Sequence, residues 1–429
     1  MSSRTLHFIG RFSGLAVMIL LAVMVEYSPA QEIRQEGRRY VAEIKKEFKA
    51  GPQGTLEIRD VTGDVTVSTV AQNTVTIFET VSMEVFTMEE ARQVLKVCQD
   101  SYSQSGEFIR VDGRERPRRS SESQFRVTVP SRFNVDISTS GGDLTIRQLM
   151  GNATLRTSGG DIELAETGGE VNATTSGGDV VVRDAGGRVA VKTSGGDLRL
   201  ERINGILDGR TSGGSISLRV ASQTVDLRTS GGDIDIFEVN GNVTASTSGG
   251  DVNVENTAGS VEVSTSGGDI VLRNIKGEIK AATSGGDVRA TTLLSAARLR
   301  TSGGDIEVRD LKASLEAATS GGEVGVEMTL ADFSKPHDLT LSSSGGSIEL
   351  TIPEKLPARI QAEIQLDESW RFGDRYDIES DFPLRIERNE AGERGGRFVR
   401  GAGEINGGGD AITLKTSAGN IIIRKGRTP

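Results

Sequence analysis

The sequence has few of the residues on which catalytic and cross-linking chemistry depends. Cys98 is the only cysteine among the 429 residues, so no disulfide can form within the chain. Of the two histidines, only His337 lies beyond the first thirty residues. Ser-His-Asp and Cys-His nucleophiles and multi-histidine zinc sites all require histidine as a base or ligand. The composition therefore argues against these classes of enzyme, and stability must come from packing and backbone pairing.

Large apolar side chains are also scarce. Aromatic residues make up 4% of the chain, with a single tryptophan, whereas there are 54 glycines. A single large core is difficult to build from this composition, and thin repeated layers are favoured.

The first thirty residues have the pattern of a signal peptide. Arg4 and Arg11 precede an apolar run from Leu15 to Val25, and the small residues Ser28-Pro29-Ala30 follow it. The run is short for a membrane span, so we interpret residues 1–30 as a secretory signal cleaved after Ala30. An uncleaved N-terminal anchor is the alternative. No cysteine lies near this site, so a lipid anchor there is not supported.

Without that segment the chain has 48 basic and 59 acidic residues, a net charge of −11. An exported acidic chain is not expected to bind nucleic acid. The two signs of charge are interspersed, which indicates a solvated surface.

An 18-residue repeat dominates the middle of the chain. The tripeptide Ser-Gly-Gly occurs eleven times at this interval, from Ser140 to Ser320, and threonine precedes every copy. A twelfth copy begins at Ser344, after 24 residues, so about six residues are inserted near 332–338. With serine as position 1, aliphatic residues recur at positions 5 and 7, and a second pair at positions 14 and 16. This alternation predicts two short strands in each unit.

Such units can bury their apolar faces only by stacking. We therefore predict an all-β fold, a parallel β-helix (β-solenoid) of 18-residue coils, with right-handed winding as the default for parallel crossovers. Strands about 4.8 Å apart would make eleven coils a rod of roughly 50 Å. The predicted organisation is a β-rich N-terminal cap (31–138) containing one helix (87–104), the solenoid (139–350) and a β-rich C-terminal cap (351–429).

The caps contain recognisable local signals. Thr87-Met88-Glu89-Glu90 is a capping box, and apolar residues at helical spacing follow it as far as Tyr102. Cys98 lies on that apolar face and is expected to be buried. The basic segment 114–119, RERPRR, is expected to be an exposed loop. Residues 55–67 and 412–423 resemble degenerate coils.

The repeated Thr-Ser-Gly-Gly-Asp is expected to be a structural corner. Paired glycines permit positive φ and close stacking, aspartate can accept from nearby N–H groups in an Asx-type turn, and threonine shares the inward parity of positions 14 and 16. A calcium-binding column is the weaker alternative, because stacked carboxylates repel each other. However, the chain lacks the GGxGxDx nonapeptide of calcium-binding β-rolls. The weak calcium candidates, more readily explained as turn residues, are Asp143, Asp161, Asp179, Asp197, Asp233, Asp251, Asp269, Asp287 and Asp305.

The outward positions of the repeat are mostly polar or charged, with Phe237 as the aromatic exception. They contain neither the aromatic platforms nor the clustered carboxylates typical of carbohydrate-active β-helix enzymes. No catalytic residue, cofactor or metal site is therefore predicted.

The repeat Thr-Ser-Gly-Gly-Asp-aliphatic-x-aliphatic resembles the "putative adhesin" β-strand-repeat family of bacterial envelope proteins, a domain family of unknown function. The resemblance extends from residues 48–65 through the helix after Thr87 to the closing segment 419–423. It implies a β-solenoid and association with the cell envelope, and it supplies no catalytic residues.

We therefore expect an exported, non-enzymatic repeat protein with an adhesin-like or scaffold surface, located in the periplasm, at the cell surface or outside the cell. Its partner would be an envelope or extracellular protein or polysaccharide, and no transmembrane helix is expected in the mature chain. The alternatives are an envelope-stress sensor or regulator that acts through its caps and, less favoured, a polysaccharide-acting enzyme.

Overall fold

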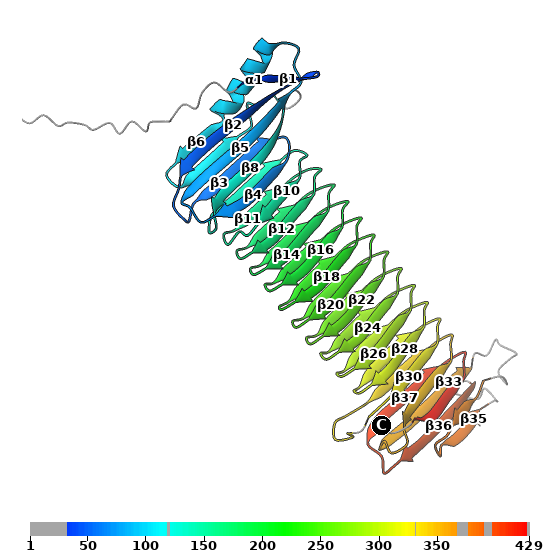
Figure 1. Cartoon of the computed structure of the whole chain (residues 1–429). Coiled ribbons are helices and arrows are strands. Elements are labelled where there is room, and N and C mark those ends of the chain that lie inside the picture. Colours follow the sequence, from blue (N-terminus) through cyan, green and yellow to red (C-terminus); the bar gives the residue numbers. More distant parts are fainter. Residues whose placement is uncertain (1–31, 118–120, 331, 367–375, 390–396, 427–429) are drawn as a thin grey trace, which may run out of the picture.

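A computed structural model describes residues 32–117, 121–330, 332–366, 376–389 and 397–426. These residues form a long rod with a larger layered body at each end (Figure 1). The predicted signal peptide lies outside the described residues.

Each 18-residue unit is one coil of the rod and contributes one strand to each of two parallel sheets. β12 (Ile162–Thr167) pairs with β14 (Val180–Ala185) so that Ile162 lies beside Val180, an offset of one repeat. β13 (Val171–Thr174) pairs with β15 (Val189–Lys192) at the same offset. Positions 5, 7, 14 and 16 face the interior, and their side chains form one continuous core along the rod. The predicted parallel β-solenoid is confirmed.

The two sheets of the rod are built from alternate strands. The first sheet contains β10 (Leu144–Arg147), β12, β14, β16 (Leu198–Ile203), β18 (Ile216–Ala221), β20 (Ile234–Val239), β22 (Val252–Thr257), β24 (Ile270–Ile275), β26 (Val288–Leu293), β28 (Ile306–Leu311), β30 (Val324–Met328) and β32 (Ile348–Pro353). The second contains β9 (Asn134–Thr139), β11 (Ala153–Arg156), β13, β15, β17 (Leu207–Arg210), β19 (Val225–Arg228), β21 (Val243–Ser246), β23 (Val261–Ser264), β25 (Ile279–Ala282), β27 (Ala297–Arg300), β29 (Leu315–Thr319) and β31 (Leu339–Ser343).

The strands of the first sheet contain a bend that simple alternation does not predict. In ten successive coils the residue at position 9, from Gln148 to Asp310, is not glycine and has a φ between +52° and +67°. This left-handed residue is skipped in the pairing, so position 10 rather than position 9 returns to the interior. Ile203, Val239 and Ile275 are fully buried there. The interior of each of these coils therefore includes position 10 in addition to positions 5, 7, 14 and 16.

The N-terminal end stacks its coils in an order that differs from their order in the chain. β3 (Thr55–Val61) and β4 (Val65–Val70) form a coil that pairs with β9 and β10 on one side. On the other side it pairs with β7 (Phe108–Asp112) and β8 (Ser121–Pro130), which come later in the sequence. The coil at residues 55–70 is thus inserted between two coils that are formed by later residues.

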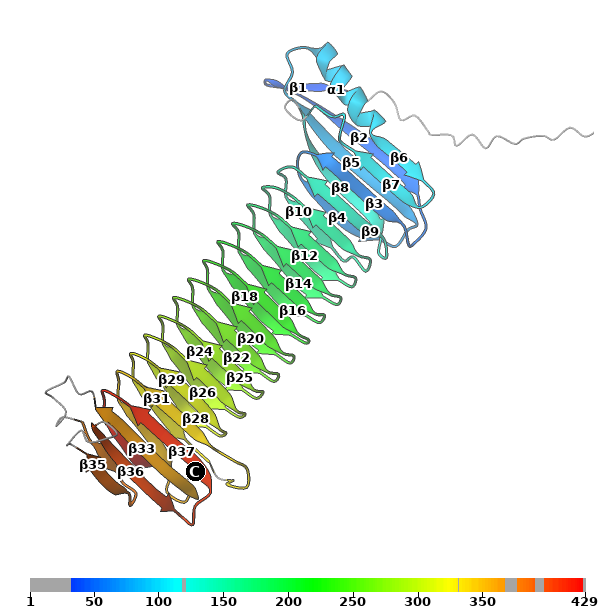
Figure 2. The same cartoon turned by 180° about the vertical axis from the view of Figure 1, so that it is seen from behind.

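Antiparallel strands complete this cap. β8 pairs with β5 (Thr74–Met83), β5 with β2 (Arg39–Lys49), and β2 with β1 (Arg34–Glu36), while β6 (Tyr102–Ser105) pairs with β7. The single described helix, α1 (Met88–Asp100), packs its apolar face on β2 and β5 at the end of the rod (Figures 1 and 2).

The predicted capping box is present, because the Thr87 side chain accepts from the Glu90 N–H and the Glu90 carboxylate accepts from the Thr87 N–H. The helix ends at Asp100, four residues before the predicted end at 104. Ser101 caps it, with its hydroxyl donating to the Cys98 carbonyl at 2.7 Å. Tyr102 then begins a strand, so its apparent helical spacing was misleading.

The C-terminal end has the same kind of reordering. β37 (Asp410–Thr416) lies between β31 and β33 (Ala358–Leu366), and β38 (Ile421–Gly426) lies between β32 and β34 (Ile378–Ser380). β36 (Arg397–Ile405) and β35 (Arg385–Asn389) extend the second sheet in antiparallel pairing. The segment near residues 332–338, predicted as an insertion, forms the connection between β30 and β31. Its His337 is buried, and its N–H donates to Asp410 Oδ1 at 3.0 Å.

Candidate functional surfaces

The threonine of each corner points inward, as predicted, and connects two coils. Thr175 is 2% exposed, its hydroxyl donates to the Gly160 carbonyl of the preceding coil at 2.9 Å, and it accepts from the Gly178 N–H of its own corner at 3.3 Å. The same arrangement recurs along the rod, with Thr265 as another example. The hydroxyls therefore bind backbone groups from coil to coil.

The paired glycines serve close stacking of the coils, and not the positive φ that was also predicted for them. None of the described Ser-Gly-Gly glycines has a positive φ, so the expectation of left-handed backbone there was wrong. The second glycine is required by close stacking instead. A Cβ on Gly178 would lie 2.1 Å from the Gly160 carbonyl oxygen, whereas a Cβ on Gly177 would lie 3.4 Å from its nearest neighbour. The corner is thus formed by contact between backbones.

The nine candidate aspartates form one column along this corner, together with Asp64 at its N-terminal end. Each Oδ1 accepts from the backbone N–H of the equivalent residue one coil further on, as in the 2.8 Å bond from the Asp179 N–H to Asp161. The predicted Asx-type turn within one corner was therefore wrong, because the acceptor reaches the next coil. Ser215 continues the column by accepting from the Asp233 N–H at 3.2 Å.

These bonds also bear on the calcium alternative. The Asp197 N–H and the Arg199 guanidinium hold the pKa of Asp179 below its usual value, and the Asp287 N–H and Arg289 do the same for Asp269. One oxygen of each aspartate in the column already has a backbone partner. Among the residues that the structure describes, no group of three or more His, Cys, Asp or Glu side chains is arranged to hold a metal ion.

The outer faces of both sheets carry ladders of ion pairs. On the first sheet Arg183 binds Glu163 at 2.8 Å, and on the second Arg228 binds Asp226 at 3.0 Å. Such exposed pairs contribute little stability individually. Their effect is to leave two long, hydrophilic faces on which much of the charge is locally compensated.

The excess negative charge nevertheless belongs to the rod. Residues 139–350 contain 19 Lys and Arg against 29 Asp and Glu, a net charge of −10, which is nearly all of the −11 of residues 31–429. The segment 229–272 has seven carboxylates and no basic residue. An anionic polymer would therefore be repelled most strongly from the middle of the rod.

The N-terminal cap contains a buried ion pair that was not predicted from the sequence. Arg116, expected in an exposed basic loop, is only 7% exposed and binds both carboxylate oxygens of Glu79, one at 3.2 Å. Ser123 and Tyr102 donate to the same carboxylate. Arg116 also donates to the Cys98 carbonyl at 3.3 Å, so the group joins α1 to β5 and β8. Arg118 and Arg119 lie outside the described residues.

This environment changes the acid–base behaviour of its neighbours. Burial raises the pKa of the Cys98 thiol to about 11, and burial together with Glu79 raises the pKa of the Tyr102 hydroxyl. Cys98 is fully buried, as expected from its place on the apolar face of the helix. A raised pKa means that this thiol stabilises the fold below about pH 9 and loses that contribution as the pH rises through about 11.

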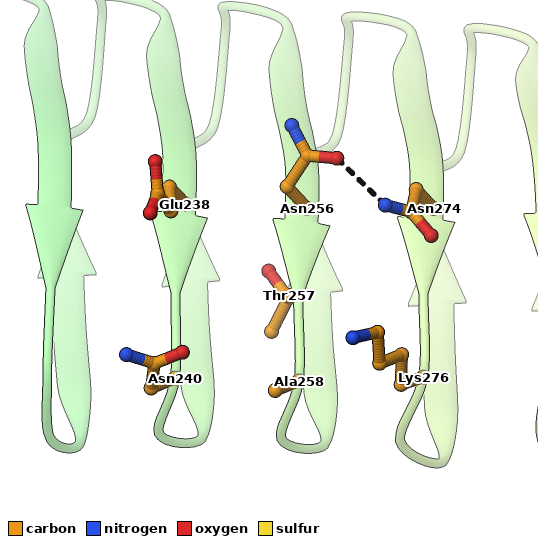
Figure 3. Close-up of a pocket in the computed structure, with 7 residues that line it drawn as sticks. All are labelled: Glu238, Asn240, Asn256, Thr257, Ala258, Asn274 and Lys276. Carbon is orange, nitrogen blue, oxygen red and sulfur yellow. Dashed lines mark hydrogen bonds between the residues drawn. The ribbon is translucent and has the colours of Figure 1, made fainter.

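A shallow groove of about 250 Å³ lies on the rod where three coils turn after the first sheet (Figure 3). Glu238 and Asn240 come from one coil, Asn256 and Ala258 from the next, and Asn274 and Lys276 from the third. Asn274 donates to Asn256 at 2.7 Å, which fixes both amides. The small Ala258 forms the low centre of the groove, with Asn240 and Lys276 at the equivalent position on either side.

These features define a class of protein: a two-sheeted parallel β-solenoid with charged outer faces and β-rich caps, of which the N-terminal cap contains the described helix. The chain belongs to the Toastrack DUF4097 family, which matches residues 187–292 and 242–424, together more than half of its length. None of the helices in the described ranges is long and apolar enough to cross a membrane.

Two solved structures are similar to the chain. A "putative adhesin" from Bacteroides fragilis is 12% identical, with a TM-score of 0.26, over 63% of this chain and 97% of the other. A "putative cell adhesion protein" from Clostridium sporogenes is 8% identical, with a TM-score of 0.15, over 90% of this chain and 100% of the other. No curated protein gives a significant match.

Proposed function

We propose that this chain is an exported, non-enzymatic adhesin-like or scaffold protein that presents its rod to a polymer or protein of the bacterial envelope. The observation that carries the proposal is the rod itself, a stiff stack of coils whose two outer faces are hydrophilic and charge-compensated. Such a surface is long enough to hold several contacts in a fixed register. The apolar run at residues 15–25 supports export, and family membership supports a repeat protein without an assigned reaction.

The test is binding by the purified mature chain, residues 31–429, to envelope fractions and isolated surface polymers. We expect saturable binding and no change in the bound polymer. The rod's contribution is measured by deleting two middle coils, residues 248–283, which joins Thr247 to Ser284 and preserves the Thr-Ser-Gly-Gly corner. Binding along the rod should weaken in this variant, whereas a sensor that acts through its caps should keep full activity. Absence of binding to every fraction would contradict the proposal.

A further inference from the structure

The groove at Glu238 to Lys276 differs chemically from the rest of the rod. The solenoid region, residues 139–350, contains eight asparagines, and five of them lie between residues 240 and 274. A primary amide both donates and accepts hydrogen bonds, which matches the vicinal hydroxyl groups of a sugar. Asn256 and Asn274 are held side by side by their mutual bond, so their remaining donors and acceptors are pre-oriented.

The two charged residues of the groove are also unusual. Neither Glu238 nor Lys276 forms a side-chain ion pair or hydrogen bond with any described residue, although many charges on the neighbouring outer faces are paired. They stand two coils apart, roughly 10 Å at the usual strand spacing. Figure 3 shows the Lys276 amine directed back toward the middle coil. One free carboxylate and one free ammonium at opposite ends leave the groove without a dominant charge.

An exposed aromatic residue adjoins the groove residue Glu238 in the sequence. Phe237 precedes Glu238 on β20 and is 43% exposed on the outer face, where Arg219 and Glu255 are its strand neighbours. An aromatic ring covers the apolar C–H face of a hexose while neighbouring polar groups bind its hydroxyls. Elsewhere the outward strand positions of the repeat have no aromatic residue.

We propose that this groove, together with Phe237, is a binding site for a hexose unit of a neutral polysaccharide. The site offers amides for the hydroxyls of the sugar and, on the adjoining outer face, an aromatic ring for its C–H face. The segment 229–272, which supplies five of the seven residues that line the groove, has seven carboxylates and no basic residue, and this excess disfavours anionic polymers such as polyuronates. This inference rests on the proposed adhesin-like function and specifies its ligand class and position.

The hydroxyl of Thr257 is not part of the proposed contact. Thr257 belongs to the floor of the groove, but it is fully buried and its hydroxyl has no hydrogen-bond partner among the described residues. A ligand on the surface cannot reach it, so its removal should leave sugar binding unchanged.

The experiment uses the mature chain with maltohexaose, cellohexaose and mannohexaose as neutral probes and polygalacturonate as the anionic probe. Saturation-transfer NMR detects weak binding, and titration gives Kd. We expect at least one neutral hexasaccharide to bind and polygalacturonate not to compete with it. Ala258→Lys fills the low centre of the groove and should raise Kd at least ~10-fold. Phe237→Ala should raise it by a similar factor, because it removes the ring that covers the C–H face of the sugar; an unchanged Kd would remove Phe237 from the site.

The matched control is Asn204→Lys, which adds the same side chain at the equivalent position of a distant coil. Lys276 and Lys312 already occupy this position, so lysine is compatible with the fold there. Equal weakening by Asn204→Lys and Ala258→Lys, or unchanged binding in Ala258→Lys, would overturn the site. If no neutral hexasaccharide binds while envelope fractions still do, the ligand class is wrong and the broader function stands. If neither binds, both proposals fail.

Discussion

Two threonines in one coil provide a sensitive test of what the interior of the rod requires. Thr167 and Thr175 both point inward and are 2% exposed. The Thr175 hydroxyl has two backbone partners, whereas the Thr167 hydroxyl has none among the described residues. Valine has nearly the shape of threonine, so a Thr→Val change alters the hydrogen bonding with little change in packing.

The two substitutions should have opposite signs. Thr167→Val removes a desolvated, unpaired hydroxyl and should stabilise the rod by about 1–2 kcal/mol. Thr175→Val removes a donor to the Gly160 carbonyl and an acceptor for the Gly178 N–H, and should destabilise it by about 1–3 kcal/mol. The predicted separation between the variants is therefore about 2–5 kcal/mol, well above the error of a paired measurement.

Equilibrium unfolding in guanidinium chloride, followed by circular dichroism, measures both changes as shifts in midpoint at unchanged slope. Thr257 and Thr265 repeat the same contrast in another coil and serve as an independent replicate. The reasoning is refuted if Thr167→Val and Thr175→Val lower the midpoint equally, because the Thr167 hydroxyl would then have a stabilising partner.

Four further predictions concern the corner, the bend, the cap and the aspartate column. Gly178→Ala should lower the melting temperature sharply because its Cβ would contact a carbonyl at 2.1 Å, while Gly177→Ala should be tolerated; equal effects would contradict the stacking argument. Val220 has a φ of +67°, a left-handed conformation that asparagine adopts more easily than valine. Val220→Asn should therefore raise the free energy of unfolding, measured by chemical denaturation, by about 1 kcal/mol. A lower free energy of unfolding in this variant would show that the valine is not strained. Arg116→Met leaves Glu79 buried and unpaired, which should cost about 3–5 kcal/mol and speed labelling of Cys98 by a thiol reagent at pH 8; unchanged labelling would show that the ion pair does not hold the helix. Melting curves with calcium and with chelator should coincide, since one oxygen of each aspartate already accepts an N–H, and a large calcium-dependent rise would establish the column as an ion site.

The rod could be predicted from the sequence because its 18-residue period repeats the same inward positions. The period specifies the stack, and the paired register of β12 and β14 follows it directly. The bend at position 9 could not be predicted from residue type, because residues as different as Arg202, Val220 and Asn256 adopt the same left-handed conformation there. There the fold of the coil overrides local preference.

The candidate surfaces were less accessible to prediction for two physical reasons. Arg116 and its partner Glu79 are 37 residues apart and meet only after β5, α1 and β8 have packed together. The groove depends on side chains from three coils, and none of its lining residues was singled out in the sequence, where only the adjoining Phe237 was noted. By contrast, the aspartate column could be anticipated from the repeat, although its hydrogen bonds join coils and not residues of one turn.

The inserted coils at the two ends constrain how the molecule reaches completion. The strands at residues 410–426 fill the space between layers made from residues 339–353 and 358–380, so strands later in the sequence occupy a place between strands formed by earlier residues. A chain cut short before Asp410 would leave unpaired strand edges on both sides of that gap, and such edges favour aggregation. The strands at residues 410–426 therefore join the end of the rod to the C-terminal layers, and the pairing of both neighbouring layers depends on them.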